Sequence, residues 1–183
     1  DLRMSRGLGD VYKRQPLDEL PPYCVVGKDE NGGYRVIKTA LVTEALEAEG
    51  TTVKVNKSHL FAVGDFVTIG GGLKGASDKI TAIDKSNAGY DVITLEAKIG
   101  AAKVGQVLVG VKEKATEGKA TLVTSSSELV ITLSKVDLTV ANQSCGLMVR
   151  GTISEGNMPF PIDAGLKALM PLILSLIHIS EPT

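Results

Sequence analysis

Between Thr51 and Val111 the chain consists of short runs of Val, Ile and Thr separated by Gly, Asn, Asp and Ser. The runs are "TTVKV", "DFVTIG", "KITAID", "DVITLE" and "GQVLVGV". β-branched residues favour strands, and clusters of turn-forming residues end them. Five short strands at this spacing predict a small barrel or sandwich of antiparallel strands.

Two stretches of this region repeat one pattern. "VKVNKSHLFAVGDFVTI" and "ITLEAKIGAAKVGQVLV" both run from a strand, through a loop, to Val-Gly and a second strand. Gly64 aligns with Gly105, and a glycine there suits a turn that needs a positive φ. We interpret the two stretches as one β-unit used twice, although short β motifs also recur by chance.

The two ends of the chain are related through their DNA. If Gly7 to Gln15 is written GGG CTC GGA GAT GTG TAT AAG AGA CAG, its reverse complement encodes Leu174 to Pro182. One further codon pairs Arg6 with Thr183. The DNA resembles the mosaic-end adapter of transposase-made sequencing libraries. We therefore expect residues 1–15 and 174–183 to be translated adapter, with both natural ends missing, and exclude them from the fold prediction.

The segments that flank the β-rich region are also mainly extended. "PLDELPPYCVVG" predicts a Pro-rich arm that leads into a short strand, and Asn31-Gly32 predicts the hairpin turn that follows. "YRVIKTALV" is expected to form one return strand, and "TEALEAEG" one helical turn. "ELVITLS", "VDLTVAN" and "CGLMVRGTIS" predict further strands. Asp163 is the expected N-cap of a helix over Ala164–Leu169, which Pro171 ends.

The predicted fold is mainly β, a small β-barrel or sandwich of short antiparallel strands with an N-terminal extended arm and hairpin and one short C-terminal helix. The expected organisation is a set of successive segments: adapter-derived residues 1–15, arm and hairpin 16–50, a barrel-like domain 51–111, a connector 112–127, a C-terminal β segment with the helix 128–173, and adapter-derived residues 174–183.

Charge and aromatic content exclude several classes of function. Residues 16–173 carry nearly balanced charge, whereas nucleic-acid-binding proteins show a basic patch or stripe. A membrane helix needs about 20 apolar residues, and the apolar C-terminal stretch is interrupted by Lys167 and Pro171. Stacking platforms need clustered aromatic faces, but the aromatic residues of this body are dispersed: Tyr23, Tyr34, Phe61, Phe66, Tyr90 and Phe160.

No catalytic, cofactor or metal site is expected. Gly70–Gly75 matches G-x-G-x-x-G but runs into another strand, whereas a phosphate-binding loop opens a helix. His59 has no second usable histidine or nearby cysteine to complete a zinc site. The carboxylates at a turn are expected to be solvated rather than paired for acid–base chemistry: Asp84, Asp91 and Glu96.

The sequence leaves two interpretations open for the redox state of the two cysteines. Cys24 and Cys145 sit beside apolar runs, and free cysteine is among the most buried residue types. We expect two buried thiols, with a disulfide as the alternative in an oxidising compartment.

Two segments carry a resemblance to known proteins. "YCVVGKDENGGYRVIKTALVTEAL" and "MVRGTISEGNMPFPIDAGLKALMPLI", with "VGDFVTI" and "ITAID" between them, resemble the head fibre and head-decoration proteins of tailed bacteriophages. The resemblance covers nearly all of residues 17–173. It implies a non-enzymatic virion protein, a homotrimer bound to the major capsid protein on the outer capsid surface and assembled in the cytoplasm of the bacterial host. In such proteins a last short strand follows the helix, where adapter-derived residues stand here.

The expected contacts with partners lie at both ends of the body. The arm Pro16–Val26, with Leu17 and Tyr23, is expected to offer unpaired backbone to a capsid edge, and Met158, Phe160 and Ile162 are expected to form apolar tips. The alternatives are a frayed arm and tips that cap the domain's own core.

A second class of function also remains open. The rival to a virion protein is a secreted carbohydrate-binding or adhesive β-module, for which an aromatic platform would be the discriminating feature. An enzyme comes third. No cofactor, nucleic acid or membrane is expected as a partner.

Overall fold

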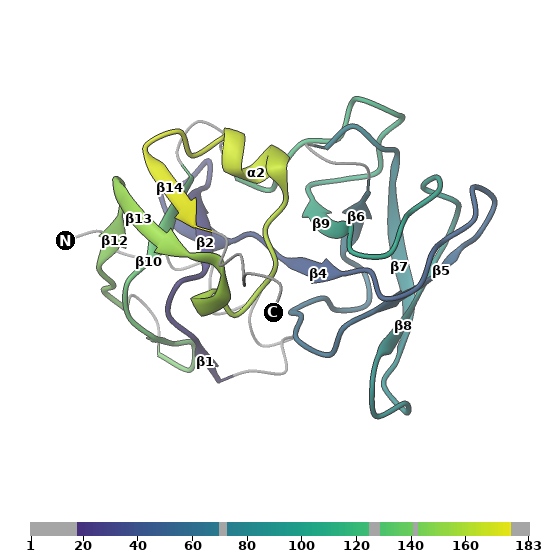
Figure 1. The fold of residues 1–183 in the computed structure, drawn as a ribbon, viewed down its shortest axis with the longest axis horizontal. Coiled ribbons are helices and arrows are strands. Elements are labelled where there is room, and N and C mark those ends of the chain that lie inside the picture. Colours follow the sequence, from purple (N-terminus) through teal and green to yellow (C-terminus); the bar gives the residue numbers. More distant parts are fainter. Residues whose placement is uncertain (1–17, 70–72, 125–128, 141–142, 177–183) are drawn as a thin grey trace, which may run out of the picture.

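The computed structural model describes residues 18–69, 73–124, 129–140 and 143–176 (Figure 1). The described chain is mainly β, with several antiparallel sheets and one short α-helix near the C-terminus, as predicted. Figure 1 shows two lobes side by side. We call the one built from β4–β9 the central lobe, and the one built from β1–β3, β10–β14 and α2 the terminal lobe.

The central lobe is a six-stranded antiparallel sheet in the order β4-β9-β6-β7-β8-β5. All five strands predicted between Thr51 and Val111 are present. The strands are β4 (Thr39–Leu41), β5 (Thr52–Val55), β6 (Phe66–Thr68), β7 (Ser77–Asp84), β8 (Asp91–Leu95) and β9 (Val107–Val111).

The sheet of the central lobe curves until its two edges meet, but it does not close into a barrel. The edge strands β4 and β5 form no ladder with each other and are joined by the isolated bridge between Val42 and Val55 and the hydrogen bonds beside it. The inward side chains of β5 and β8 alternate with half-buried or exposed ones, as a half-buried sheet requires. They pack around Phe61, Ile80 and Leu108 as the core of this lobe.

The two aligned glycines adopt the predicted conformation. Gly64 has φ 98° and Gly105 has φ 86°. The two turns also make equivalent hydrogen bonds, each from the backbone N–H two residues before the glycine to the side chain one residue after it. Ala62 N–H donates to Asp65 Oδ2 at 2.9 Å, and Lys103 N–H donates to Gln106 Oε1 at 2.8 Å. The two turns therefore share their local geometry, in agreement with a β-unit used twice.

The terminal lobe combines the first and last parts of the described chain. Its main sheet has the order β12-β10-β2-β3, β1 pairs with β11, and β13 pairs in parallel with β14. The elements are β1 (Glu19–Leu20), β2 (Val25–Lys28), β3 (Tyr34–Val36), β10 (Leu129–Thr132), β11 (Val136–Asp137), β12 (Leu147–Met148), β13 (Gly151–Ser154), a 3-10 turn (Glu155–Asn157), α2 (Ala164–Ala168) and β14 (Ile173–Leu176).

Strand β9 lies between the lobes, and all five of its residues are buried. Leu108 belongs to the core of the central lobe. Val107 and Val109 pack instead with terminal-lobe side chains such as Ile131 and Leu166. β9 thus belongs to the sheet of the central lobe and contributes side chains to the core of that lobe and to the apolar interface between the lobes.

Three local predictions are wrong. "CGLMVRGTIS" was expected as one strand, but it divides into β12 and β13, which pair in different sheets. "YRVIKTALV" was expected as one strand, but it divides into β3 in the terminal lobe and β4 in the central lobe, because the chain crosses between the lobes at Ile37 and Lys38. "TEALEAEG" forms no helical turn. Leu46 is buried in the core and pairs with Ala102 through an isolated bridge, and this tertiary contact overrides the local helix propensity.

The C-terminal helix is confirmed, one residue shorter than expected. The Asp163 side chain accepts a hydrogen bond from Leu166 N–H at 2.7 Å, which is the predicted N-cap. After the helix, β14 pairs with β13, so Leu174–Leu176, which were excluded from the fold prediction, occupy a strand position.

Candidate functional site

The N-terminal arm is part of the fold rather than a free strand. β1 pairs with β11, and Leu20 is completely buried. Tyr23 N–H donates to the Thr132 carbonyl at 2.8 Å, and β2 is paired on both sides. The expectation of an unpaired arm is therefore wrong for residues 18–26, since the chain's own strands satisfy its backbone. Leu17 lies outside the described residues.

The other expected contact residues also pack inward. Tyr23, Met158 and Ile162 are half-buried against the apolar interface between the lobes. Phe160 is half-buried against the terminal-lobe core. The hydroxyl of Thr39 donates to the Pro161 carbonyl at 2.7 Å and holds this turn against the chain. These residues pack on the protein's own core, which is the alternative left open by the sequence, and their place at a partner interface stays a prediction.

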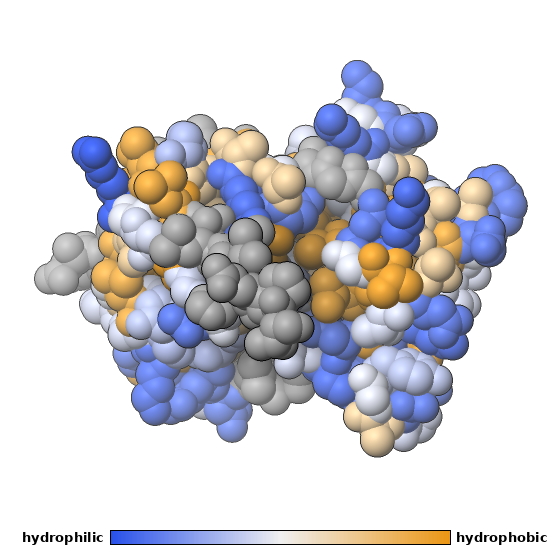
Figure 2. Space-filling model, viewed as in Figure 1, coloured by the Kyte–Doolittle hydropathy of each residue, from blue (hydrophilic) through white to orange (hydrophobic). Residues whose placement is uncertain are grey.

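Exposed apolar surface occurs instead in a groove on the terminal lobe. The groove has a volume of about 330 Å³, and its apolar lining includes Tyr34, Leu129, Val130, Val149, Met170 and Leu172. Val149 is 58% exposed and Leu172 is 56% exposed. Figure 2 shows hydrophobic surface over the end of this lobe where β14 and α2 lie. We call this feature the terminal groove.

The terminal groove was not predicted from the sequence. It joins β3 and β10 to the chain that follows α2, and those segments are far apart in sequence. The only local signals are Val149 beside Arg150 and Leu172 after Pro171, and neither has a periodic pattern.

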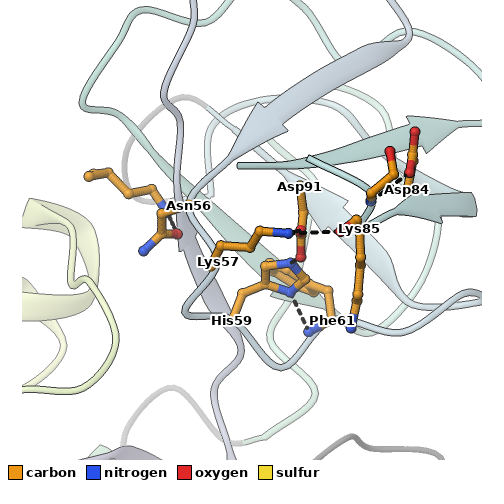
Figure 3. Close-up of polar contacts among 9 residues, drawn as sticks. Asn56, Lys57, His59, Phe61, Asp84, Lys85 and Asp91 are labelled. Carbon is orange, nitrogen blue, oxygen red and sulfur yellow. Dashed lines mark hydrogen bonds and ion pairs between the residues drawn. The ribbon is translucent and has the colours of Figure 1, made fainter. Parts of the chain in front are cut away.

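A second cluster is polar and lies at one end of the central lobe (Figure 3). The loop after β5 supplies Lys57, His59 and Phe61, and Asp91 opens β8. His59 Nε2 lies 3.0 Å from Asp91 Oδ2, and Lys57 Nζ lies 2.6 Å from Asp91 Oδ1. Phe61 N–H donates to His59 Nδ1 at 3.2 Å.

The hydrogen bonds of this cluster fix the state of the imidazole ring. Because Nδ1 accepts from the Phe61 amide, the ring proton is on Nε2 and donates to Asp91. Burial lowers the pKa of His59 from its ordinary 6.5, against the opposing effect of Asp91. His59 is therefore a neutral, fully bonded side chain without an adjacent nucleophile, and the geometry is that of a structural contact.

Asp91 corrects one prediction about the carboxylates. Asp84 and Glu96 are exposed as expected, but Asp91 is only 2% exposed. Asp91 begins the inward-facing alternation of Ile93 and Leu95 on β8, and this period of two was the available signal. His59 is 32 residues away, so their contact had no local signature.

The glycine-rich stretch lies between two strands, as predicted. The glycine-rich stretch connects β6 to β7, with residues 70–72 outside the described part, and a strand follows it. Gly75 is required sterically, since a Cβ there would lie 1.9 Å from the Ile69 carbonyl oxygen. Among the described residues, no group of three or more His, Cys, Asp or Glu is placed to hold a metal ion, and no helix is long and apolar enough to cross a membrane.

Both cysteines are free thiols in different environments. Cys24 is 1% exposed, and burial, with a smaller effect from Cys145, raises its pKa to about 12. Cys145 is half-buried. The expectation of two buried thiols is thus confirmed for Cys24 and wrong for Cys145.

Comparison with known protein families, curated proteins and solved structures finds no match to this chain.

Proposed function

We propose that this chain is a non-enzymatic structural protein of a phage virion, a head fibre or decoration protein. In this proposal a homotrimer binds the major capsid protein on the outer surface of the capsid. The observation that carries it is the terminal groove. Tyr34 comes from the first segment with the family resemblance, and Val149 and Leu172 come from the second. The fold brings the two segments together at an exposed apolar surface.

An apolar groove of this kind suits adhesion rather than a reaction. Burial of apolar surface contributes about 25 cal/mol per Å² removed from water, so covering Val149 and Leu172 would favour association. A partner that binds only the assembled shell stabilises it by mass action. Three copies held together engage several capsid sites at once, and modest single contacts then give tight overall binding.

The carbohydrate-binding alternative receives less support from the structure. Such modules stack sugars on exposed aromatic faces. Each aromatic side chain in the described part of the chain is buried or half-buried. Tyr90, for example, lies beneath the Lys54 ammonium, which is 5.3 Å from the ring centroid.

The test is co-sedimentation with expanded capsids assembled from the major capsid protein of the same phage. Val149→Asp places a charge in the terminal groove. Val63→Asp is the matched control, since Val63 is 56% exposed on the central lobe. We expect trimers in sedimentation equilibrium, capsid binding by the wild type and by Val63→Asp, and at least tenfold weaker binding by Val149→Asp. A monomer that does not bind capsids would refute the proposal. Equal effects of the two substitutions on capsid binding would exclude the terminal groove as the capsid-binding surface.

A further inference from the structure

The loop between β5 and β6 joins the two lobes through adjacent side chains. Leu60 is 1% exposed and packs in the terminal-lobe core with Leu20 and Cys24. Phe61 is also 1% exposed and packs in the core of the central lobe. One peptide unit therefore anchors two separate apolar cores, and its position depends on the residue before it, His59.

His59 holds this segment by two hydrogen bonds. Its Nδ1 accepts from Phe61 N–H, and its Nε2–H donates to Asp91 on β8. Both side chains of the second bond are at most 3% exposed. A proton added at Nδ1 would face the Phe61 N–H, so the first bond exists only while the ring is neutral.

The charges around the ring act in opposite directions: the Asp91 carboxylate favours protonation of His59, and the lysines beside it disfavour it. Asp91 is the acid that faces it, and Lys57 already pairs with that carboxylate at 2.6 Å. Lys57 and Lys85 are the cations close enough to disfavour a second positive charge. Lys57 Nζ also donates to the Lys85 backbone carbonyl at 3.0 Å, and this bond holds the Lys57 side chain and the backbone of Lys85 beside the site (Figure 3). An imidazolium here would be a buried and only partly compensated charge.

We propose that His59 is an acid-sensitive latch between the lobes. Protonation of its ring breaks the hydrogen bond to the Phe61 amide and releases the Leu60–Phe61 segment, which loosens the packing of the terminal lobe on the central lobe. The latch is independent of the partner that the terminal groove binds.

The pH window follows from linkage. Burial holds the pKa of His59 below its unfolded value of 6.5, so the unfolded chain binds more protons than the folded chain between those two values. The stabilisation is therefore fully present well above pH 6.5. It is lost progressively as the pH falls through 6.5 towards the folded pKa, and the opening equilibrium rises by at most about tenfold per pH unit.

Cys24 is a reporter of this opening because it shares the terminal-lobe core with Leu60. The experiment uses the full chain with His178→Gln and Cys145→Ser, which leaves His59 and Cys24 as the only residues of their kinds. The Cys24 thiol is labelled with a pyridyl disulfide, which reacts with thiols in acid. The rate at each pH is divided by the rate for the same chain in denaturant.

The matched variant adds His59→Gln, whose amide can still donate to Asp91 but does not titrate. We expect Cys24 labelling in the reference chain to rise between pH 6.5 and 5.5, by at most about fivefold because half of the opened chains already carry the proton at pH 6.5, and to stay constant in His59→Gln. A rise of the same size in both chains would overturn the proposal, as would constant protection in the reference chain.

A second measurement decides the question if His59→Gln does not fold. The ¹H NMR titration of the single histidine in the reference chain gives the midpoint for His59. We expect the Phe61 amide resonance and the Cys24 labelling rate to change at that same midpoint, below pH 6.5. Midpoints that differ would overturn the proposal.

Discussion

Leu20 gives the sharpest test of whether the N-terminal arm is part of the fold. Its side chain is completely buried in the terminal-lobe core. Leu20→Ala removes transfer energy of about 2 kcal/mol, at about 0.8 kcal/mol per buried methylene. The cavity that remains adds about 1–2 kcal/mol where the neighbours do not collapse. We expect a loss of about 3–4 kcal/mol in the free energy of unfolding.

The assay is urea unfolding of the full chain, followed by far-ultraviolet circular dichroism at neutral pH. Glu19→Ala is the control, because Glu19 is the neighbouring residue of β1 and makes only an exposed ion pair with Lys135. That substitution should cost less than about 1 kcal/mol. If Leu20→Ala costs no more than the control at an unchanged m-value, the arm is frayed and the reasoning fails.

Two further predictions concern the helix cap and the thiols. Asp163→Ala removes the acceptor for Leu166 N–H and should lower the free energy of unfolding by about 1 kcal/mol in the same urea assay; an unchanged midpoint would contradict the cap. At pH 8 a thiol reagent should label Cys145 and spare Cys24, whose pKa burial raises to about 12, so that native chains take up one label and denatured chains two. Rapid double labelling of the native chain would contradict the burial of Cys24.

Local patterns predicted the strands of the central lobe well, because each carries β-branched residues and ends at turn residues. The alternation at Val53 and Val55, and at Ile93 and Leu95, matches the buried faces of β5 and β8. The positive φ of Gly64 and Gly105 was also predictable, since few other residues fit such turns.

Long-range features were not predictable in the same way. The split of β3 from β4 depends on how the lobes pack, and Ile37 and Lys38 carry no turn signal. The same limit applied to the candidate sites. Met158 and Phe160 were expected to be exposed tips, because the sequence could not show the core that they cover. The His59–Asp91 contact depends on the register of β8 against the loop after β5.

The order of strands in the terminal lobe has a consequence for biosynthesis. β2 lies between β3 and β10, with Val26 opposite Val130, so its partner on one side leaves the ribosome only after the whole central lobe. Such non-local pairing gives the chain a high contact order, which slows folding. Until β10 is synthesised, the hairpin of β2 and β3 has one strand edge whose backbone groups are unpaired. During that interval the nascent chain is most prone to aggregation.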